Sequence, residues 1–342
     1  MIWLTWRQFR VQALTAATAL AAVAILLGVT GPPMANRYAA SGLAGCHGDG
    51  CANLASAFLS QLQTGAVDHV VYPVGLLLIL ATPALIGLFW GAPLIAREFE
   101  TGTYRLAWNQ SVTRTRWLTV KLALTGLAAM AVTEALSLMH AWWADPISKA
   151  IALGGGASVF SGNQYSWLTF ASRGITPLGY AAFGFALGTA VGALIRRAVP
   201  AMAVTLAIFA VAEVPMPLWV RPVIIPPAQT ITTVDAAGVN FGSLTASDVP
   251  GQPEAWVVSS YAVNAAGQHV TALPDSCFPQ NAQAKFNEDP GQCMDKLGIR
   301  EVVSYQPASR YWPLQLIETG IFLALALALT GFCFWLLGRR RA

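Results

Sequence analysis

The feature that most constrains the fold is a run of 26 residues without a charged side chain, residues 71–96. A helix needs about 20 predominantly apolar residues to cross a hydrocarbon core about 30 Å thick. Composition agrees, since only 11% of the 342 residues are charged and 55% are hydrophobic, whereas roughly 25% of the residues in a typical soluble domain are charged. We therefore expect an integral membrane protein.

Six apolar runs predict six transmembrane helices in an all-α polytopic membrane protein. They cover residues 11–31, 71–93, 118–140, 174–195, 198–219 and 314–337. Only Arg196 and Arg197 separate the fourth run from the fifth, so these two helices are expected to form a tight antiparallel hairpin. A small extracellular domain, mainly β or irregular, is expected between the fifth and sixth helices, at residues 220–313.

Basic residues predict the orientation, because Lys and Arg concentrate in cytoplasmic loops. With both termini in the cytoplasm, the cytoplasmic segments hold 12 of the 20 basic residues. These are Arg7, Arg10, Arg97, Arg105, Arg114, Arg116, Lys121, Arg196, Arg197, Arg339, Arg340 and Arg341. The protein is therefore expected to be a multi-pass protein of the plasma membrane.

Cysteines support the same orientation. Cys46 and Cys51 fall in one segment predicted outside, and Cys277 and Cys293 fall in the other. Disulfides persist in oxidising compartments, so two pairs on the outer side are expected to be bridged. Cys333 lies inside the last helix and is expected to be inert.

Residues 1–10 leave two alternatives open. Trp3, Trp6, Phe9 and Arg10 suit a short interfacial helix in the headgroup region, and they suit the first turns of the first span equally well. The apolar stretch that follows is long for the core of a secretory signal, so this segment is expected to be retained.

Two segments are predicted outside the membrane. In the outer loop, residues 32–70, the second half predicts a short amphipathic helix, and the tip at 46–51 offers Cys, His and Asp as metal ligands. Its glycines and the oxidising side favour a small disulfide ring, so no metal site is predicted.

In the extracellular domain, strands are predicted at 256–263 and 302–305, with a turn at 264–267. This domain either recognises a ligand or covers the outer mouth.

The fourth span carries Gly184, Gly188 and Gly192 at four-residue spacing. Helices in lipid associate through close packing, so a ridge of small residues predicts a helix–helix contact. The partner helix belongs either to the same chain or to a second copy.

Three carboxylates, Glu134, Glu213 and Glu318, lie in or at the edge of apolar helices. A charge at the bilayer centre costs roughly 2.5 to 3.5 kcal/mol or more, so each needs a partner, water or an inward position. They either line an outward-opening cavity that favours cationic amphipathic cargo, or form structural pairs, for example with Arg221 or Arg310.

A polar segment follows the longest uncharged run directly. It consists of Arg97, Glu98, Phe99, Glu100, Thr101, Gly102 and Thr103. Two carboxylates followed by a glycine that can end a helix predict a rigid polar projection on which another protein can push. The alternative is an ordinary polar helix end.

The sequence around this segment resembles the permease subunits of ABC-2-type transporters, the actinobacterial ones in particular. The resemblance rests on Phe-Trp-Gly-Ala-Pro at 89–93, Glu-Phe-Glu-Thr-Gly-Thr at 98–103, Trp-Asn-Gln-Ser-Val-Thr-Arg-Thr-Arg-Trp at 108–117, and Lys121. It is specific over residues 83–121 and architectural elsewhere. It implies that residues 97–103, within a coupling loop at 97–117, dock onto a cytoplasmic ABC ATPase, with Glu98 and Glu100 as acceptors. It also implies a homodimer or heterodimer with a second permease, and export of amphipathic small molecules, drugs, antibiotics or lipids.

Nucleotide chemistry is not expected in this chain. The phosphate-binding pattern Gly-x-x-x-x-Gly-Lys-Ser/Thr does not occur, and the glycines at 154–156 are followed by no lysine. ATP and Mg²⁺ would therefore bind the partner ATPase, and this chain is expected to have neither a cofactor nor enzymatic activity. No nucleic-acid partner is expected, because the basic residues serve topology and lipid headgroups. A proton-coupled secondary transporter and a non-transporting membrane sensor remain alternatives.

Overall fold

The computed structural model describes residues 2–48, 50–65, 67–102, 113–156, 160, 163–233, 239–240, 243–244, 249, 251–252, 254–270, 277 and 290–339. The chain divides into two compact units, which are described separately below. One unit comprises Met1–Leu218 and Pro313–Ala342, and the other comprises Trp219–Trp312.

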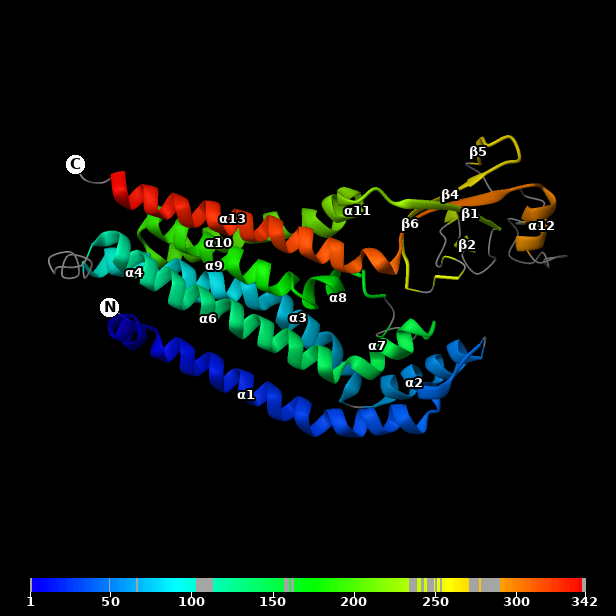
Figure 1. Ribbon diagram of the computed structural model, residues 1–342, viewed down its shortest axis with the longest axis horizontal. Helices are drawn as coiled ribbons and strands as arrows, with labels where there is room; N and C mark the ends of the chain where they lie inside the picture. Colours follow the sequence, from blue (N-terminus) through cyan, green and yellow to red (C-terminus); the bar gives the residue numbers. More distant parts are fainter. Residues whose placement is uncertain are drawn as a thin grey trace. The chain divides into compact units, whose positions relative to one another are not determined.

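The larger unit is a helical bundle (Figure 1). Among the residues described, six helical stretches are long and apolar enough to cross a membrane, as the sequence predicts. They are formed by α1 (Ile2–Ala40), by α3 (Asp68–Ile86) with η2 (Gly87–Gly91) and α4 (Ala92–Thr101), by α6 (Arg114–Trp143), by α9 (Thr176–Ile195), by α10 (Ala198–Glu213) with η4 (Met216–Val220) and α11 (Arg221–Ile224), and by η6 (Ala308–Arg310) with α13 (Tyr311–Arg339). Helices satisfy every backbone hydrogen bond within one segment, as lipid demands.

The first helix is longer at both ends than the apolar run that predicts it. Residues 2–10 form its first turns, and it continues to Ala40 through Pro32 and Pro33. Proline inside a helix costs a backbone hydrogen bond, and packing offsets that cost here, because Met34 is fully buried in a cluster with Trp143. The outer loop predicted from residue 32 therefore starts at residue 41.

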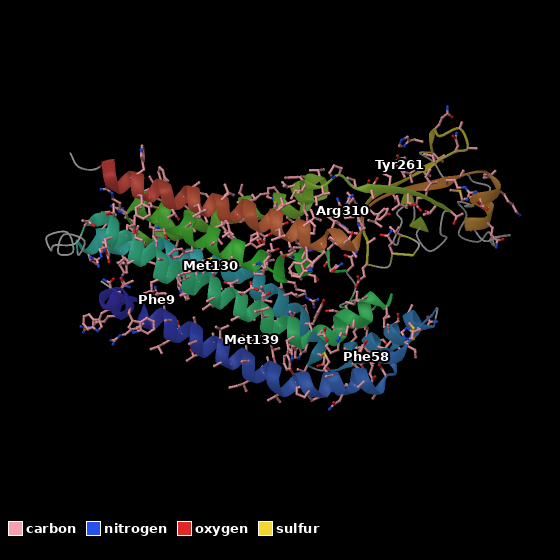
Figure 2. The ribbon with its side chains drawn as sticks, viewed as in Figure 1. Phe9, Phe58, Met130, Met139, Tyr261 and Arg310 are labelled. Carbon is pink, nitrogen blue, oxygen red and sulfur yellow. A yellow bond between two sulfur atoms is a disulfide. The ribbon has the colours of Figure 1, made fainter. Side chains whose placement is uncertain are left out.

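Outside the spans, this unit contains short helices that pack together. They are η1 (Leu43–Gly45), α2 (Cys51–Thr64), α7 (Asp145–Ala152) and α8 (Trp167–Ser172). The predicted amphipathic helix is α2, whose apolar face includes Phe58 (Figure 2) and Leu59. A disulfide joins Cys46 to Cys51, as predicted.

The centre of the bundle is α9, of which 78% of the most apolar stretch is buried, compared with 6% for α1. Its predicted glycine ridge faces the second span of the same chain. A Cβ added at Gly184 would lie 2.5 Å from the Pro83 carbonyl oxygen, and one added at Gly188 or Gly192 would overlap backbone of Gly87 or Ala92. The ridge therefore lets two backbones meet within one subunit.

Facing the ridge, the second span changes to π-helix geometry over Gly87–Gly91. The glycines of this turn lie against the backbone of α9. A Cβ added at Gly87 would lie 2.6 Å from the Gly184 carbonyl oxygen, and one added at Gly91 would lie 2.6 Å from the Phe185 carbonyl oxygen. Single π-turns inside α-helices often mark functional sites.

The smaller unit contains an antiparallel sheet with strand order β1-β6-β4-β5. Its strands are β1 (Ala228–Thr233), β4 (Trp256–Val263), β5 (His269–Val270) and β6 (Arg300–Gln306), and a separate hairpin pairs β2 (Val239–Asn240) with β3 (Ser243–Leu244). The strand predicted at 256–263 is β4, and the one at 302–305 lies within β6. The turn at 264–267 closes with Gly267 at φ 76°. The predicted disulfide joins Cys277 to Cys293 of α12 (Pro290–Lys296).

Candidate functional site

The polar segment that is predicted to couple to another protein lies at one end of the helical bundle. There α1 begins, α4 ends, α6 begins, α9 turns into α10 and α13 ends (Figure 1). We call this the basic end, after its residues Arg7, Arg10, Arg97, Arg116, Lys121, Arg196 and Arg197. It is the end that the sequence predicts to be cytoplasmic.

The predicted helix terminator lies where the sequence places it. Gly102 is the C-cap of α4 and adopts the left-handed conformation, with φ 70°, which glycine adopts without steric cost. Thr101 donates its hydroxyl hydrogen bond to the Arg97 carbonyl oxygen, 2.9 Å away. The chain re-enters a helix at Thr113, whose hydroxyl accepts a hydrogen bond from the Arg116 N–H and caps α6. Thr103, the last residue of the predicted segment, lies outside the described residues.

Glu98 faces inward. Its carboxylate forms an ion pair and hydrogen bond with the Lys121 ammonium of α6. The pair is nearly enclosed, since the Glu98 side chain is 12% exposed and that of Lys121 is 3% exposed. Lys121 also lies 4.9 Å from the ring centroid of Trp117. The pair ties α4 to α6, and most of the Glu98 carboxylate is turned away from solvent.

Glu100 joins α4 to the hairpin between α9 and α10. Its Oε1 accepts a hydrogen bond from the Ala198 N–H at 2.9 Å, in the first turn of α10, where helix N–H groups lack partners. On the other side of the hairpin, the Arg196 guanidinium lies 5.4 Å from the ring centroid of Phe99. Arg196 has φ 58°, and among the residues described it is the only non-glycine residue with a positive φ.

A cavity of about 450 Å³ lies beside the buried ion pair. Residues of α1, η2, α4, α6 and α10 line it, among them Gln12, Glu98 and Lys121. Gln12 donates from Nε2 to the Phe89 carbonyl oxygen of the π-turn at 3.1 Å, and Phe9 of α1 (Figure 2) packs edge-on against Trp90 at 4.8 Å between ring centroids. The first helix is thus fastened to the π-turn of the second span.

Comparison with known families assigns the chain. Residues 17–221 match the family described as ABC-2 membrane transporter related. The chain belongs to this family. It is therefore a membrane subunit of an ABC-2-type transporter, and membership implies partnership with an ABC ATPase. No curated protein and no solved structure matches the chain. The matched residues include the basic end except for the start of α1, before residue 17, and the end of α13.

In this ABC-2 permease, three of the side chains described in the predicted coupling segment are exposed: Arg97, Glu100 and Thr101. They form the outward face of the last turns of α4, whereas Glu98 and Phe99 are partly buried against neighbouring helices. The segment thus has an outer face that a partner can reach, from which Glu100 also bonds to α10, and an inner face in contact with α6 and the end of α9.

The three predicted cavity carboxylates occupy different settings. Glu318 of α13 is fully buried and accepts a hydrogen bond from the Tyr180 hydroxyl of α9. Glu213 of α10 lies within electrostatic range of Glu318, and in the described structure one oxygen each of Glu213 and Glu134 is buried without a hydrogen-bond partner. Neither the cavity beside Glu98 nor a second one of about 330 Å³ between α1 and the end of α6 is lined by any of the three. Arg310, considered as their partner, donates instead to Pro226 O and Gln306 Oε1.

Sequence reasoning missed the contacts of two residues of the basic end. Gln12 was not singled out, although it is an amide within an otherwise apolar stretch, and such a side chain needs a partner in lipid. Lys121 was recognised as a cytoplasmic basic residue and through the family resemblance, but its pairing with Glu98 was not, although it is the only lysine or arginine of the third apolar run. A lone polar side chain inside a span is therefore the signal for both.

Proposed function

We propose that this ABC-2 permease exports amphipathic small molecules, drugs, antibiotics or lipids, driven by a separate ATPase. ATP and Mg²⁺ bind the ATPase, and this chain supplies the membrane path without catalysis of its own. Two permeases, identical or different, pair to form the path. The protein lies in the plasma membrane with its basic end on the cytoplasmic side, so that the ATPase can reach that end.

The observation that carries the proposal is the bonding of the last turns of α4. Glu98 joins these turns to α6 through Lys121. Phe99, through Arg196, and the exposed Glu100, through Ala198, join them to the α9–α10 hairpin. A displacement of α4 by a partner would therefore be passed to the central helix α9, whose glycine ridge is in backbone contact with the second span. Packed helices that move between discrete arrangements transmit such displacements.

A charge reversal on the exposed face tests the proposal. The tagged permease and its R97E variant are purified from native membranes, and the ABC ATPase that accompanies each is identified and quantified by mass spectrometry. We expect wild type to retain a stoichiometric ATPase and R97E to lose most of it. R10E is the matched control, because Arg10 is exposed at the same end but lies on α1.

Two outcomes contradict the proposal. One is the absence of any nucleotide-binding partner in the wild-type preparation, and the other is transport that continues without an ATPase and depends on a proton gradient. Equal loss of the ATPase in R97E and R10E would remove the coupling role from α4, because the effect would then follow net charge alone.

A further inference from the structure

Arg173, at the junction of α8 and α9, is a partly buried cation for which the described residues provide no counter-charge. Its Nε and Nη2 atoms are buried and have no hydrogen-bond partner, and no carboxylate of the described residues pairs with it. A guanidinium stays ionised in proteins. An ionised group removed from water costs several kcal/mol unless a counter-charge offsets it, so this setting favours an anion from outside the chain.

His140 of α6 lies within electrostatic range of Arg173. Its side chain is 2% exposed. Nε2 lies 3.2 Å from the Tyr72 carbonyl oxygen, and because a carbonyl only accepts, Nε2 carries the hydrogen. Nδ1 is buried and has no partner in the part of the chain described. Among the described residues, a donor group on Arg173 and an acceptor atom on His140 are therefore both without partners, and the bond from Ser137 to Ser172 brings the two chain segments together.

The packing around both residues fixes their positions. The Ser172 hydroxyl donates to Leu76 O at 3.0 Å, and its carbonyl accepts from the Ser137 hydroxyl at 2.9 Å. On the far side of Arg173, Gln315 Oε1 accepts from the Ile175 N–H at 3.2 Å and the Thr176 N–H at 3.1 Å. The backbone that carries Arg173 is therefore held by α3, α6 and α13, which fixes the point from which its side chain extends.

Space for the imidazole is provided by Gly75 of α3. A Cβ added at that position would overlap the His140 ring. The rings of Tyr72 and Trp143 flank the imidazole, each at 5.9 Å between centroids. His140 is thus seated in a rigid aromatic setting with one nitrogen free.

We propose that Arg173 and His140 bind the anionic head group, phosphate or carboxylate, of an amphipathic ligand. The free guanidinium N–H groups would donate to its oxygens, the geometry in which arginine binds oxyanions most strongly. His140 Nδ1 would accept a hydrogen bond from the hydroxyl of a singly protonated phosphate, whereas an ionised carboxylate would bind through Arg173 alone. Arg173 as a whole is only partly buried, which leaves a route to the site. An apolar tail would lie along the surrounding membrane-spanning helices. That the ligand is the exported molecule rests on the proposed export function. Binding of the ligand does not require the ATPase.

The test uses the purified full chain in a neutral detergent. It is titrated at matched mole fractions with dodecyl phosphate, dodecanoate and the neutral dodecyl glucoside, and with inorganic phosphate, while the thermal unfolding midpoint and the apparent Kd are measured. We expect both anionic amphiphiles to stabilise the chain, and the neutral amphiphile and inorganic phosphate to leave it unchanged. Equal binding of inorganic phosphate would overturn the amphipathic part of the proposal.

Variants separate the site from non-specific charge effects. R173Q should weaken binding of dodecyl phosphate at least tenfold, R173K should retain part of it, and H140N should weaken it less than R173Q. K149Q is the matched control, because Lys149 is exposed and paired with Asp145. R173Q should also unfold at a higher temperature than ligand-free wild type, since it removes an uncompensated charge, so its folding can be verified independently.

Equal affinity of wild type and R173Q, or equal binding of anionic and neutral amphiphiles, would overturn the anion site. Because these measurements use no ATPase, such a result would leave the export function standing. Conversely, loss of the ATPase partnership would leave a measured anion site intact.

Discussion

Glu98 of α4 and Lys121 of α6 form an ion pair inside the protein, although they lie 23 residues apart in the chain. Removing one partner of a buried pair leaves the other charge uncompensated, which costs about 3 to 5 kcal/mol. We therefore expect K121M to lower the free energy of unfolding by about that amount, measured by thermal or denaturant unfolding in detergent.

The double variant decides whether the pair is responsible. E98Q/K121M leaves no buried charge, so most of the lost stability should return. K149M provides the control, because the Lys149–Asp145 pair is more than half exposed and exposed pairs contribute about 0 to 1 kcal/mol. A double variant as unstable as K121M alone would show that Lys121 acts by another route.

A second prediction concerns the stability of the contact made by the glycine ridge of α9. G188A places a methyl group against the backbone of Gly87 and Ala92, and overpacking of this kind costs about 1 to 3 kcal/mol. G331A in α13 has nothing within 4 Å of the added Cβ, so it should be neutral or stabilising by up to about 1 kcal/mol. The unfolding midpoint of G188A should therefore fall, and that of G331A should stay unchanged or rise. Equal effects would mean that the α9 contact is looser than the structure has it.

Substitutions of Glu100 can distinguish its contribution to stability from a role in coupling to the ATPase. E100A removes the acceptor for the Ala198 N–H and should cost about 1 kcal/mol, as loss of a helix cap does. E100Q keeps an oxygen acceptor and should retain that stability. If the charge of Glu100 contacts the ATPase, E100Q should nevertheless lower ATP-driven export measured in vesicles. Full export by both variants would restrict Glu100 to its role at the start of α10.

The features predicted correctly from the sequence are those that depend on residues close together in the chain. Apolar length predicted the six spans, a run rich in valine and aromatic residues predicted strand β4, and Gly102 marked the end of α4. The π-turn at Gly87–Gly91 has no local signature, because it depends on the opposing glycines of α9. The continuation of α1 past Pro32 was missed for a similar reason, since the packing of Met34 outweighs the local cost of proline.

The candidate site shows the same division. The segment around Glu98 and Glu100 was recognised from its residues, but their separate partners, Lys121 and Ala198, come from other helices. Charge spacing along the chain says nothing about which carboxylate turns inward. Likewise, Arg173 and His140 are 33 positions apart in sequence, and only the tertiary packing leaves both with open hydrogen-bonding atoms.

The orientation of the basic end can be tested by cysteine labelling, because the native cysteines do not compete. Four are in disulfides and Cys333 is buried. T101C and S60C place a thiol at exposed positions on α4 and α2. In intact cells, a membrane-impermeant maleimide should label S60C and should reach T101C only after permeabilisation, because the basic residues predict a cytoplasmic α4 end. Labelling of T101C from the medium would place the segment 97–102 outside the cell, where no cytoplasmic ATPase could contact it.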